Sequence, residues 1–244
     1  MTENKGKLDK IAIVGCGAVG SFYGAKLCQS GRDVHFLLRS DYEAVRDNGV
    51  HIQSLNRDFH VRPVTAKSPW EIGRCDLIVV GLKSTANHRL GELLTPLVGE
   101  GTVLLTLQNG LGNEAALAKR FPAQPVFGGM CFVCLNRIAP GVVQHLAHGK
   151  IVLGRHGGSP DELTGAIAEL FRSTGIPVDV SPDLERRTGK SWSGISRSTV
   201  SVSPVRRDST PHSSGGSAPA NPSAPASPLT HCSTTGPGSN LSRN

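Results

Sequence analysis

The segment from Gly15 to Gly20 reads GCGAVG, and its glycine spacing suits phosphate binding. It follows the short apolar run IAIV and precedes a stretch with helical spacing of apolar residues. Gly15 permits a tight turn, Gly17 lets the backbone approach a pyrophosphate, and Gly20 lets the helix pack on the sheet. The alternative is a purely structural turn. We expect the amides at this helix start to bind a dinucleotide, and the residues concerned are Gly15, Cys16, Gly17, Ala18, Val19 and Gly20.

The end of the next apolar run, DVHFLLR, favours one dinucleotide over the other. NAD sites usually place Asp or Glu about 20 residues after the glycines, where the carboxylate binds the ribose 2′-hydroxyl. This chain has Arg39 there, followed by Ser40. A guanidinium and a hydroxyl suit a 2′-phosphate, so the sequence predicts NADP as the cofactor. The alternative is that Arg39 is a solvated charge and Asp41 takes the acidic role.

Lys83 and Asn109 each follow an apolar run directly, in DLIVVGLK and TVLLTLQNG. Ligands of open α/β sheets bind beyond the carboxyl ends of the strands, where both residues are expected to lie. A lysine there can hold a phosphate or carboxylate, and a side-chain amide can orient nicotinamide or substrate. We therefore expect both residues to contribute to cofactor and substrate binding, although a strand-end lysine can also be merely solvated.

Strand and helix patterns alternate through residues 1–185, which predicts one α/β domain with a Rossmann-type, doubly wound, mostly parallel sheet. Expected strands include 10–15, 33–39, 75–83 and 102–110, with a hairpin over 50–63. Helices are expected over 18–31 and 159–175, the second capped by Ser159. The strand patterns PVFGGMCFVCL, GVVQHLAHG and KIVLG come between.

Residues 186–244 differ sharply in composition from the rest. They are rich in Ser, Pro and Gly, and they hold seven Lys or Arg against one acid, which is +6 of the chain's net charge of +7. This composition predicts a disordered tail. Because the charge lies on the tail and no basic-aromatic platform accompanies it, nucleic acid is not an expected partner.

Several features exclude other classes of function. No apolar run reaches the about 18 residues of a membrane span, and the N-terminus lacks a signal-peptide pattern, so we expect a cytoplasmic protein with no membrane partner. The six cysteines show no disulfide spacing. Cys131 and Cys134 have CxxC spacing without a second pair, which predicts buried thiols and no metal site. His145 and His148 are expected to be structural.

Four segments in this order, IVGCGAVGSFYGAKL, DLIVVGLKS, LQNGLGNE and GVVQHLAHGKIVLG, resemble the N-terminal domain of the 2-dehydropantoate 2-reductase (ketopantoate reductase) family. The resemblance covers about residues 10–185. It implies NADPH-dependent reduction of 2-dehydropantoate, a small 2-oxo acid, to pantoate in pantothenate and coenzyme A biosynthesis. It also implies that Arg39 meets the 2′-phosphate, that Lys83 and Asn109 line the nicotinamide and substrate site, and that a cofactor contact lies near Leu135 and Asn136. The intact family member could form a homo-oligomer.

The family's helical second domain, with a catalytic lysine in the pattern Lys-x3-Asn-x3-Asn and a later acidic residue, has no counterpart here, so the catalytic residues are unknown. Lys190 lacks the two asparagines. One synonymous coding of KSWSGISRSTVSVS, read from its third base, gives KLVWNIPFNGLSV, which contains the pattern. We therefore predict a frame shift near residues 186–189 and an impaired or inactive chain. The alternatives are a non-catalytic NADP-binding or interaction protein and a related 2-oxo acid reductase.

Overall fold

A computed structural model of the chain describes residues 8–55 and 57–184. The predicted tail, Lys190 and the predicted boundary near residue 185 lie outside the described residues. The strands are β1 Lys10–Val14, β2 Asp33–Leu37, β3 Val50–Ser54, β4 Phe59–Val61, β5 Val64–Ala66, β6 Leu77–Val80, β7 Val103–Thr106, β8 Val126–Ala139, β9 Val142–Arg155 and β10 Val178–Val180. The helices are α1 Ala18–Gln29, α2 Tyr42–Asn48, α3 Pro69–Ile72, α4 Leu90–Leu94, α5 Asn113–Arg120 and α6 Glu162–Arg172, with 3₁₀ segments η1 Ser84–Arg89 and η2 Thr95–Leu97.

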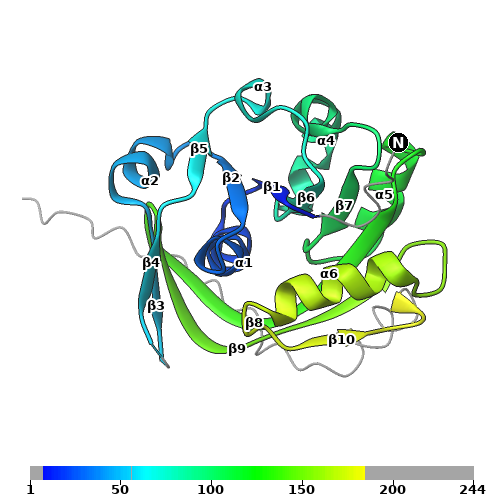
Figure 1. The fold of residues 1–244 in the computed structure, drawn as a ribbon. Helices are drawn as coiled ribbons and strands as arrows, with labels where there is room; N and C mark the ends of the chain where they lie inside the picture. Colours follow the sequence, from blue (N-terminus) through cyan, green and yellow to red (C-terminus); the bar gives the residue numbers. More distant parts are fainter. Residues whose placement is uncertain (1–7, 56, 185–244) are drawn as a thin grey trace, which may run out of the picture. The chain divides into compact units, whose positions relative to one another are not determined.

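These strands form one mostly parallel sheet in the order β4-β3-β9-β8-β7-β6-β1-β2-β5, with β10 added beside β9. Only the β3–β4 and β8–β9 pairs are antiparallel within this part of the chain. The sheet curls, so that α1 contacts both the β1–β2 part and the β8–β9 part (Figure 1). This is the Rossmann-like, parallel-dominated α/β fold that the alternating strand and helix patterns predict.

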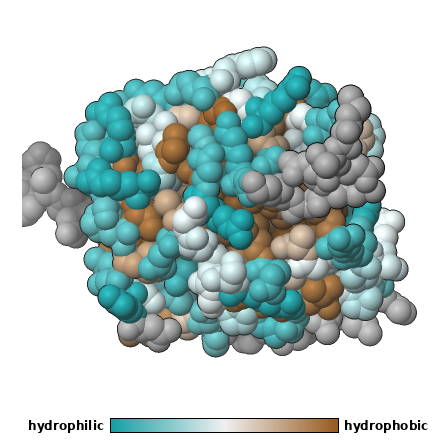
Figure 2. Space-filling model, in the orientation of Figure 1, coloured by the Kyte–Doolittle hydropathy of each residue, from teal (hydrophilic) through white to brown (hydrophobic). Residues whose placement is uncertain are grey.

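Apart from Lys10 at the start of β1 and Thr106 at the end of β7, strands β1, β6 and β7 are apolar because both faces of the sheet are covered. In β1, Ile11 and Ile13 pack into the core on the α1 side, whereas Ala12 and Val14 pack into the core on the opposite side. All four are at most 1% exposed. Figure 2 shows a surface that is hydrophilic over most of one face, with apolar residues visible near its centre.

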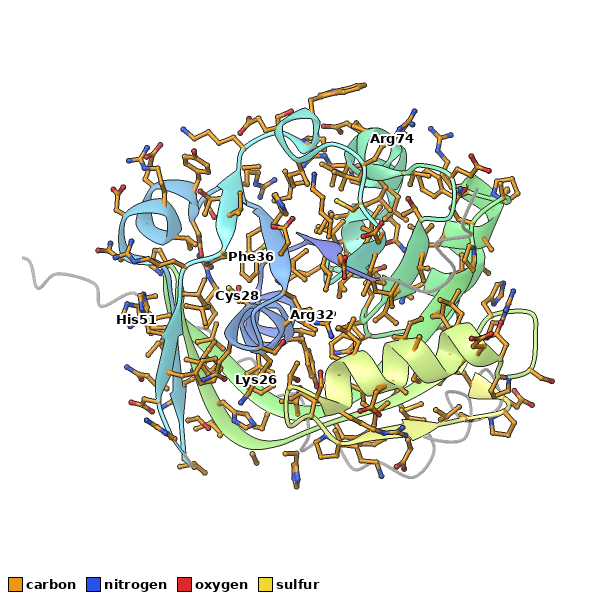
Figure 3. All side chains as sticks on the ribbon, viewed as in Figure 1. Lys26, Cys28, Arg32, Phe36, His51 and Arg74 are labelled. Carbon is orange, nitrogen blue, oxygen red and sulfur yellow. The ribbon has the colours of Figure 1, made fainter. Side chains whose placement is uncertain are left out.

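Helix α1 fits closely against β2. Phe36 of β2 is fully buried, and a Cβ atom at Gly24 would lie 2.6 Å from its ring. Lys26 and Cys28 lie further along α1 (Figure 3), and the Lys26 ammonium is 4.6 Å from the ring centre of Phe59 on β4. The absence of a side chain at Gly24 therefore brings the helix that starts at the glycine turn close to the sheet.

The structure confirms the hairpin over 50–63 as β3 and β4, and it corrects two expectations. The three strand patterns between residues 125 and 154 form only two strands, because β8 and β9 are each 14 residues long and pair as one irregular hairpin. The cap of α6 is Asp161, not Ser159: its carboxylate accepts a 2.9 Å hydrogen bond from the Thr164 amide.

Within residues 8–55 and 57–184, no helix combines the length and apolar character needed to cross a membrane.

Candidate functional site

The carboxyl ends of β1, β2, β6 and β7 meet at one edge of the sheet. These strands are parallel, and the registers pair Val14 with both Leu37 and Val80, and Val80 with Thr106. The chain leaves β1 toward β2 on one side and later returns to β6 on the other side of β1. The gap beyond β1 and β6 is therefore a topological switch point, which is where open α/β sheets bind ligands.

A cavity of about 600 Å³ lies at this edge, within the size range of small-molecule and cofactor sites. Five of the predicted site residues line it, namely Gly15, Cys16, Gly17, Arg39 and Lys83. Ala18, Val19 and Gly20 form the first turn of α1 just behind it. The structure therefore brings the glycine turn, the end of β2 and the end of β6 together around one space.

Gly15 and Gly20 have no room for a side chain, whereas Gly17 has room for one. Gly15 has φ +101°, and a Cβ atom there would lie 2.4 Å from the Leu82 amide nitrogen. A Cβ at Gly20 would lie 2.2 Å from the Gly15 carbonyl oxygen. At Gly17, which lines the cavity, a Cβ would meet nothing within 4 Å. The turn is thus packed against the protein on one side and open toward the cavity at Gly17.

Five Lys or Arg residues and one acidic residue line the cavity wall. Within the part of the chain that the structure describes, the Arg39 guanidinium and the Lys83 ammonium have no hydrogen-bond or ion-pair partner. Two other cations of the wall are already paired: Lys67 lies 2.7 Å from Glu43, and Arg89 donates to both oxygens of Glu92. Arg39 and Lys83 are exposed, so both remain available for an anionic ligand.

Asp41 is the one acidic residue of this wall among the described residues, and it is buried. Its carboxylate accepts hydrogen bonds from Arg137 Nε at 2.9 Å and from Arg137 Nη2, from Ser40 Oγ at 2.9 Å, and from the Gly141 amide at 3.4 Å. Burial by itself raises the pKa of this carboxyl, but these hydrogen bonds and the charge of Arg137 outweigh it and hold the pKa below its usual value. Asp41 is therefore ionised at neutral pH and neutralised by Arg137.

Asn109 lies at the same sheet edge in the loop after β7, but it is not among the residues that line the cavity. Its loop is joined to η1 by a chain of amides. Gln108 Nε2 donates to Asn87 Oδ1 at 2.8 Å. Asn87 Nδ2 donates to Asn113 Oδ1 at 3.0 Å, and Asn113 Nδ2 donates to the Gly110 carbonyl at 3.0 Å. This chain holds the segment after Lys83 and the segment around Asn109 in fixed relative positions.

Replacing Asn87 by Ala is expected to lower the free energy of unfolding by about 1–3 kcal/mol. The reason is that Gln108 and Asn113, 9% and 1% exposed, each lose a side-chain partner that water cannot easily replace. Urea unfolding followed by circular dichroism measures the effect. Ser84→Ala, at an exposed position of the same segment, is the control and is expected to change stability by less than about 0.5 kcal/mol. An equal effect of both substitutions contradicts a role for the amide chain.

The cysteines and histidines singled out from the sequence have structural surroundings. Burial is the main cause that raises the pKa of the Cys16 and Cys131 thiols, for Cys131 to about 12. His145 Nδ1 lies 3.0 Å from Ser54 Oγ, and its Nε2 lies 2.8 Å from the His148 carbonyl oxygen. Among the described residues, no cluster of three or more His, Cys, Asp or Glu could hold a metal ion. The groups of the site that could bind a ligand are therefore the glycine turn and the cations of the cavity wall.

Sequence reasoning missed Arg137 as a member of the site. It lies 96 residues from Asp41, near the end of β8, and reaches the cavity only because the β8–β9 hairpin folds back toward α2. The one local signal was an arginine near the end of an otherwise apolar strand pattern. Leu135 is buried and Asn136 is partly buried on the same strand.

Sequence and structure comparisons show which known proteins this chain resembles. The sequence model of the ketopantoate reductase PanE/ApbA family matches residues 11–158, which is more than half of the chain. The chain belongs to this family. A 2-dehydropantoate 2-reductase from Nostoc sp. is 42% identical over 181 residues, covering 72% of this chain and 57% of that protein. One from Halobacterium salinarum is 32% identical over 185 residues, covering 72% and 59%.

Among solved structures, the crystal structure of 2-dehydropantoate 2-reductase from Geobacter metallireducens superposes with a TM-score of 0.71. It is 49% identical in sequence, and the match covers 73% of this chain and 60% of that one. The relatives are thus oxidoreductases by name, and the chain spans less than two thirds of the length of each of them. The matched part contains the glycine turn and the cavity at the sheet edge.

Proposed function

We propose that this chain binds NADPH in the cavity at the sheet edge, as the cofactor-binding part of a 2-dehydropantoate 2-reductase. The observation that supports the proposal most directly is the composition of the cavity wall. Gly17 leaves space for a pyrophosphate, Arg39 and Lys83 are cations with no partner among the described residues, and the carboxylate of Asp41 is already neutralised. These features match a ligand that carries several phosphates.

The residues fit the cofactor at each of its charged parts. The amides at the start of α1 would bind the pyrophosphate, together with the positive end of the helix dipole. Arg39 at the end of β2 would meet the 2′-phosphate, and its unpaired state favours NADPH over NADH. Lys83 and Asn109 would line the nicotinamide and substrate side. When bound, the cofactor supplies a hydride to the ketone carbon of the substrate.

The substrate side follows from the family. We propose 2-dehydropantoate as the 2-oxo acid and pantoate as the product, in the cytoplasm, as a step toward pantothenate and coenzyme A. Lys83 is suited to attract the substrate carboxylate, and an amide such as that of Asn109 can orient it. The family's catalytic lysine and acidic residue have no identified counterpart in this chain, so we propose that its turnover is low or absent.

We also propose that the coding sequence changes frame near residues 186–189. The alternative frame of KSWSGISRSTVSVS gives KLVWNIPFNGLSV, with three polar residues at the spacing of the family's substrate-domain pattern. Sequencing the gene across these codons tests the idea, and an alternative frame that does not encode the pattern contradicts it.

Measuring the dissociation constants of NADPH and NADH separately tests the proposed cofactor. We expect NADPH to bind at least about tenfold more tightly, because a charge-assisted contact to the 2′-phosphate contributes about 1.5–3 kcal/mol. Arg39→Met is expected to remove most of this difference while the weaker binding of NADH stays. Equal affinity of the unaltered chain for the two dinucleotides contradicts the choice of NADPH.

A further inference from the structure

Arg137 and Asp41 form a charge pair on the wall of the cavity, beside Arg39 and Ser40. Asp41 directly precedes α2 and follows β2 by a few residues, whereas Arg137 comes from the far hairpin strand β8. The Asp41 side chain is 8% exposed and the Arg137 side chain 40% exposed. The pair therefore presents the arginine to the cavity and keeps the carboxylate behind it.

We propose that Arg137 is a specificity-determining residue: it neutralises Asp41 and so makes the end of β2 acceptable to the 2′-phosphate of NADPH. This inference rests on the proposed binding of a dinucleotide and adds the group that sets the preference between NADPH and NADH.

Asp41 accepts several hydrogen bonds from other residues of the protein. An ionised carboxylate has about four acceptor sites. Oδ1 accepts from Ser40 Oγ and Arg137 Nη2, and Oδ2 accepts from Arg137 Nε and the Gly141 amide. All four sites are used within the protein. Asp41 therefore has no acceptor site left for a ribose hydroxyl, which is the role that an acidic residue at the end of this strand plays in NAD sites.

The charge of Asp41 also affects the binding of a 2′-phosphate. An unpaired carboxylate two residues from Arg39 would repel a 2′-phosphate and compete for the Arg39 guanidinium. With Arg137 in place, the pair is neutral, and Arg39 on the same wall is a cation that has no partner within residues 8–55 and 57–184. Removing Arg137 would thus have two effects in the same direction: a weaker site for the 2′-phosphate and a freed carboxylate for the ribose diol of NADH.

The pair also has a structural role that the test must separate. The Gly141 amide that donates to Asp41 belongs to the turn between β8 and β9, and the Gly141 carbonyl accepts a 2.8 Å hydrogen bond from the His51 amide. Loss of Arg137 will therefore lower stability as well. A purely structural role weakens the binding of both dinucleotides alike, whereas a role in specificity changes the ratio of their dissociation constants.

The experiment measures the dissociation constants of NADPH and NADH by fluorescence titration of the full chain and its variants, with circular dichroism as a check of folding. Arg137→Met is expected to lower the preference for NADPH by about tenfold, and adding Asp41→Asn is expected to restore most of it. Arg137→Lys keeps the charge and is expected to keep most of the preference. Arg62→Met removes an exposed arginine that is not on the cavity wall and is expected to leave the ratio unchanged.

Each outcome decides the question. An unchanged ratio in Arg137→Met overturns the proposal, and so does a lowered ratio that Asp41→Asn fails to restore, since Arg137 would then act on the phosphate alone. If Arg137→Met does not fold, Asp41→Asn in the otherwise unaltered chain decides: a kept or raised preference for NADPH supports the proposal, and a lowered one overturns it. An unaltered chain that binds neither dinucleotide contradicts the proposed function, and this assignment with it.

Discussion

Replacing Gly15 by Ala is expected to lower the free energy of unfolding by about 3–5 kcal/mol, since backbone strain and overpacking each cost about 1–3 kcal/mol. The residue has φ +101°, and its new Cβ would lie 2.4 Å from Leu82 N and 2.6 Å from Gly81 C. These are backbone atoms of the segment that leaves β6, so they cannot move aside as a flexible side chain could. Urea unfolding followed by circular dichroism measures the loss.

Gly17→Ala is the matched control for this prediction. Its Cβ would meet nothing within 4 Å, so the free energy of unfolding is expected to change by less than about 0.5 kcal/mol. The methyl group would instead occupy space toward the cavity, and NADPH affinity is expected to fall by about tenfold or more. Equal stability of the two variants contradicts the packing argument, and unchanged NADPH affinity in Gly17→Ala contradicts the placement of the pyrophosphate.

The sequence was most informative where one local pattern has one physical cause. The run IAIV is apolar at every position because β1 is covered on both faces, and Gly15 after it occurs where the turn must pass close to the segment that leaves β6. Lys83 and Arg39 could be placed at the sheet edge because the carboxyl ends of parallel strands meet there. Predicting the positions of these two residues requires only the direction of the strands and the spacing along the chain, and both can be inferred from the sequence.

Contacts between distant segments could not be predicted in the same way. Its position after β2 makes Asp41 a candidate ribose ligand, yet its partners Arg137 and Gly141 come from about 100 residues later in the chain, and only the folded hairpin brings them together. The N-terminal cap of α6 also could not be predicted from the sequence alone. Ser159 and Asp161 are both suitable caps by residue type, and the backbone geometry that selects Asp161 is a property of the folded chain.

The chain is expected to bind NADPH but to reduce 2-dehydropantoate about 10²–10⁴-fold more slowly than the product of the restored frame, because a positioned acid or base contributes about that factor. The restored protein would carry the lysine and both asparagines of KLVWNIPFNGLSV. NADPH oxidation measured at 340 nm in the presence of 2-dehydropantoate gives the turnover of both proteins. Similar turnover of the two contradicts the proposed loss of activity.

Measuring NADPH affinity in the same preparations separates two causes of low turnover. If the catalytic half is missing and the cavity is intact, the dissociation constant of this chain stays within about tenfold of the restored protein's, a difference of about 1.4 kcal/mol or less. If the cofactor-binding part itself is disrupted, affinity and turnover fall together. In the restored protein, replacing the lysine of the pattern by Ala is expected to lower turnover to the level of this chain while NADPH binding is kept. That combination assigns the difference to the missing acid or base, because the cavity of Gly17, Arg39 and Lys83 is common to all three proteins.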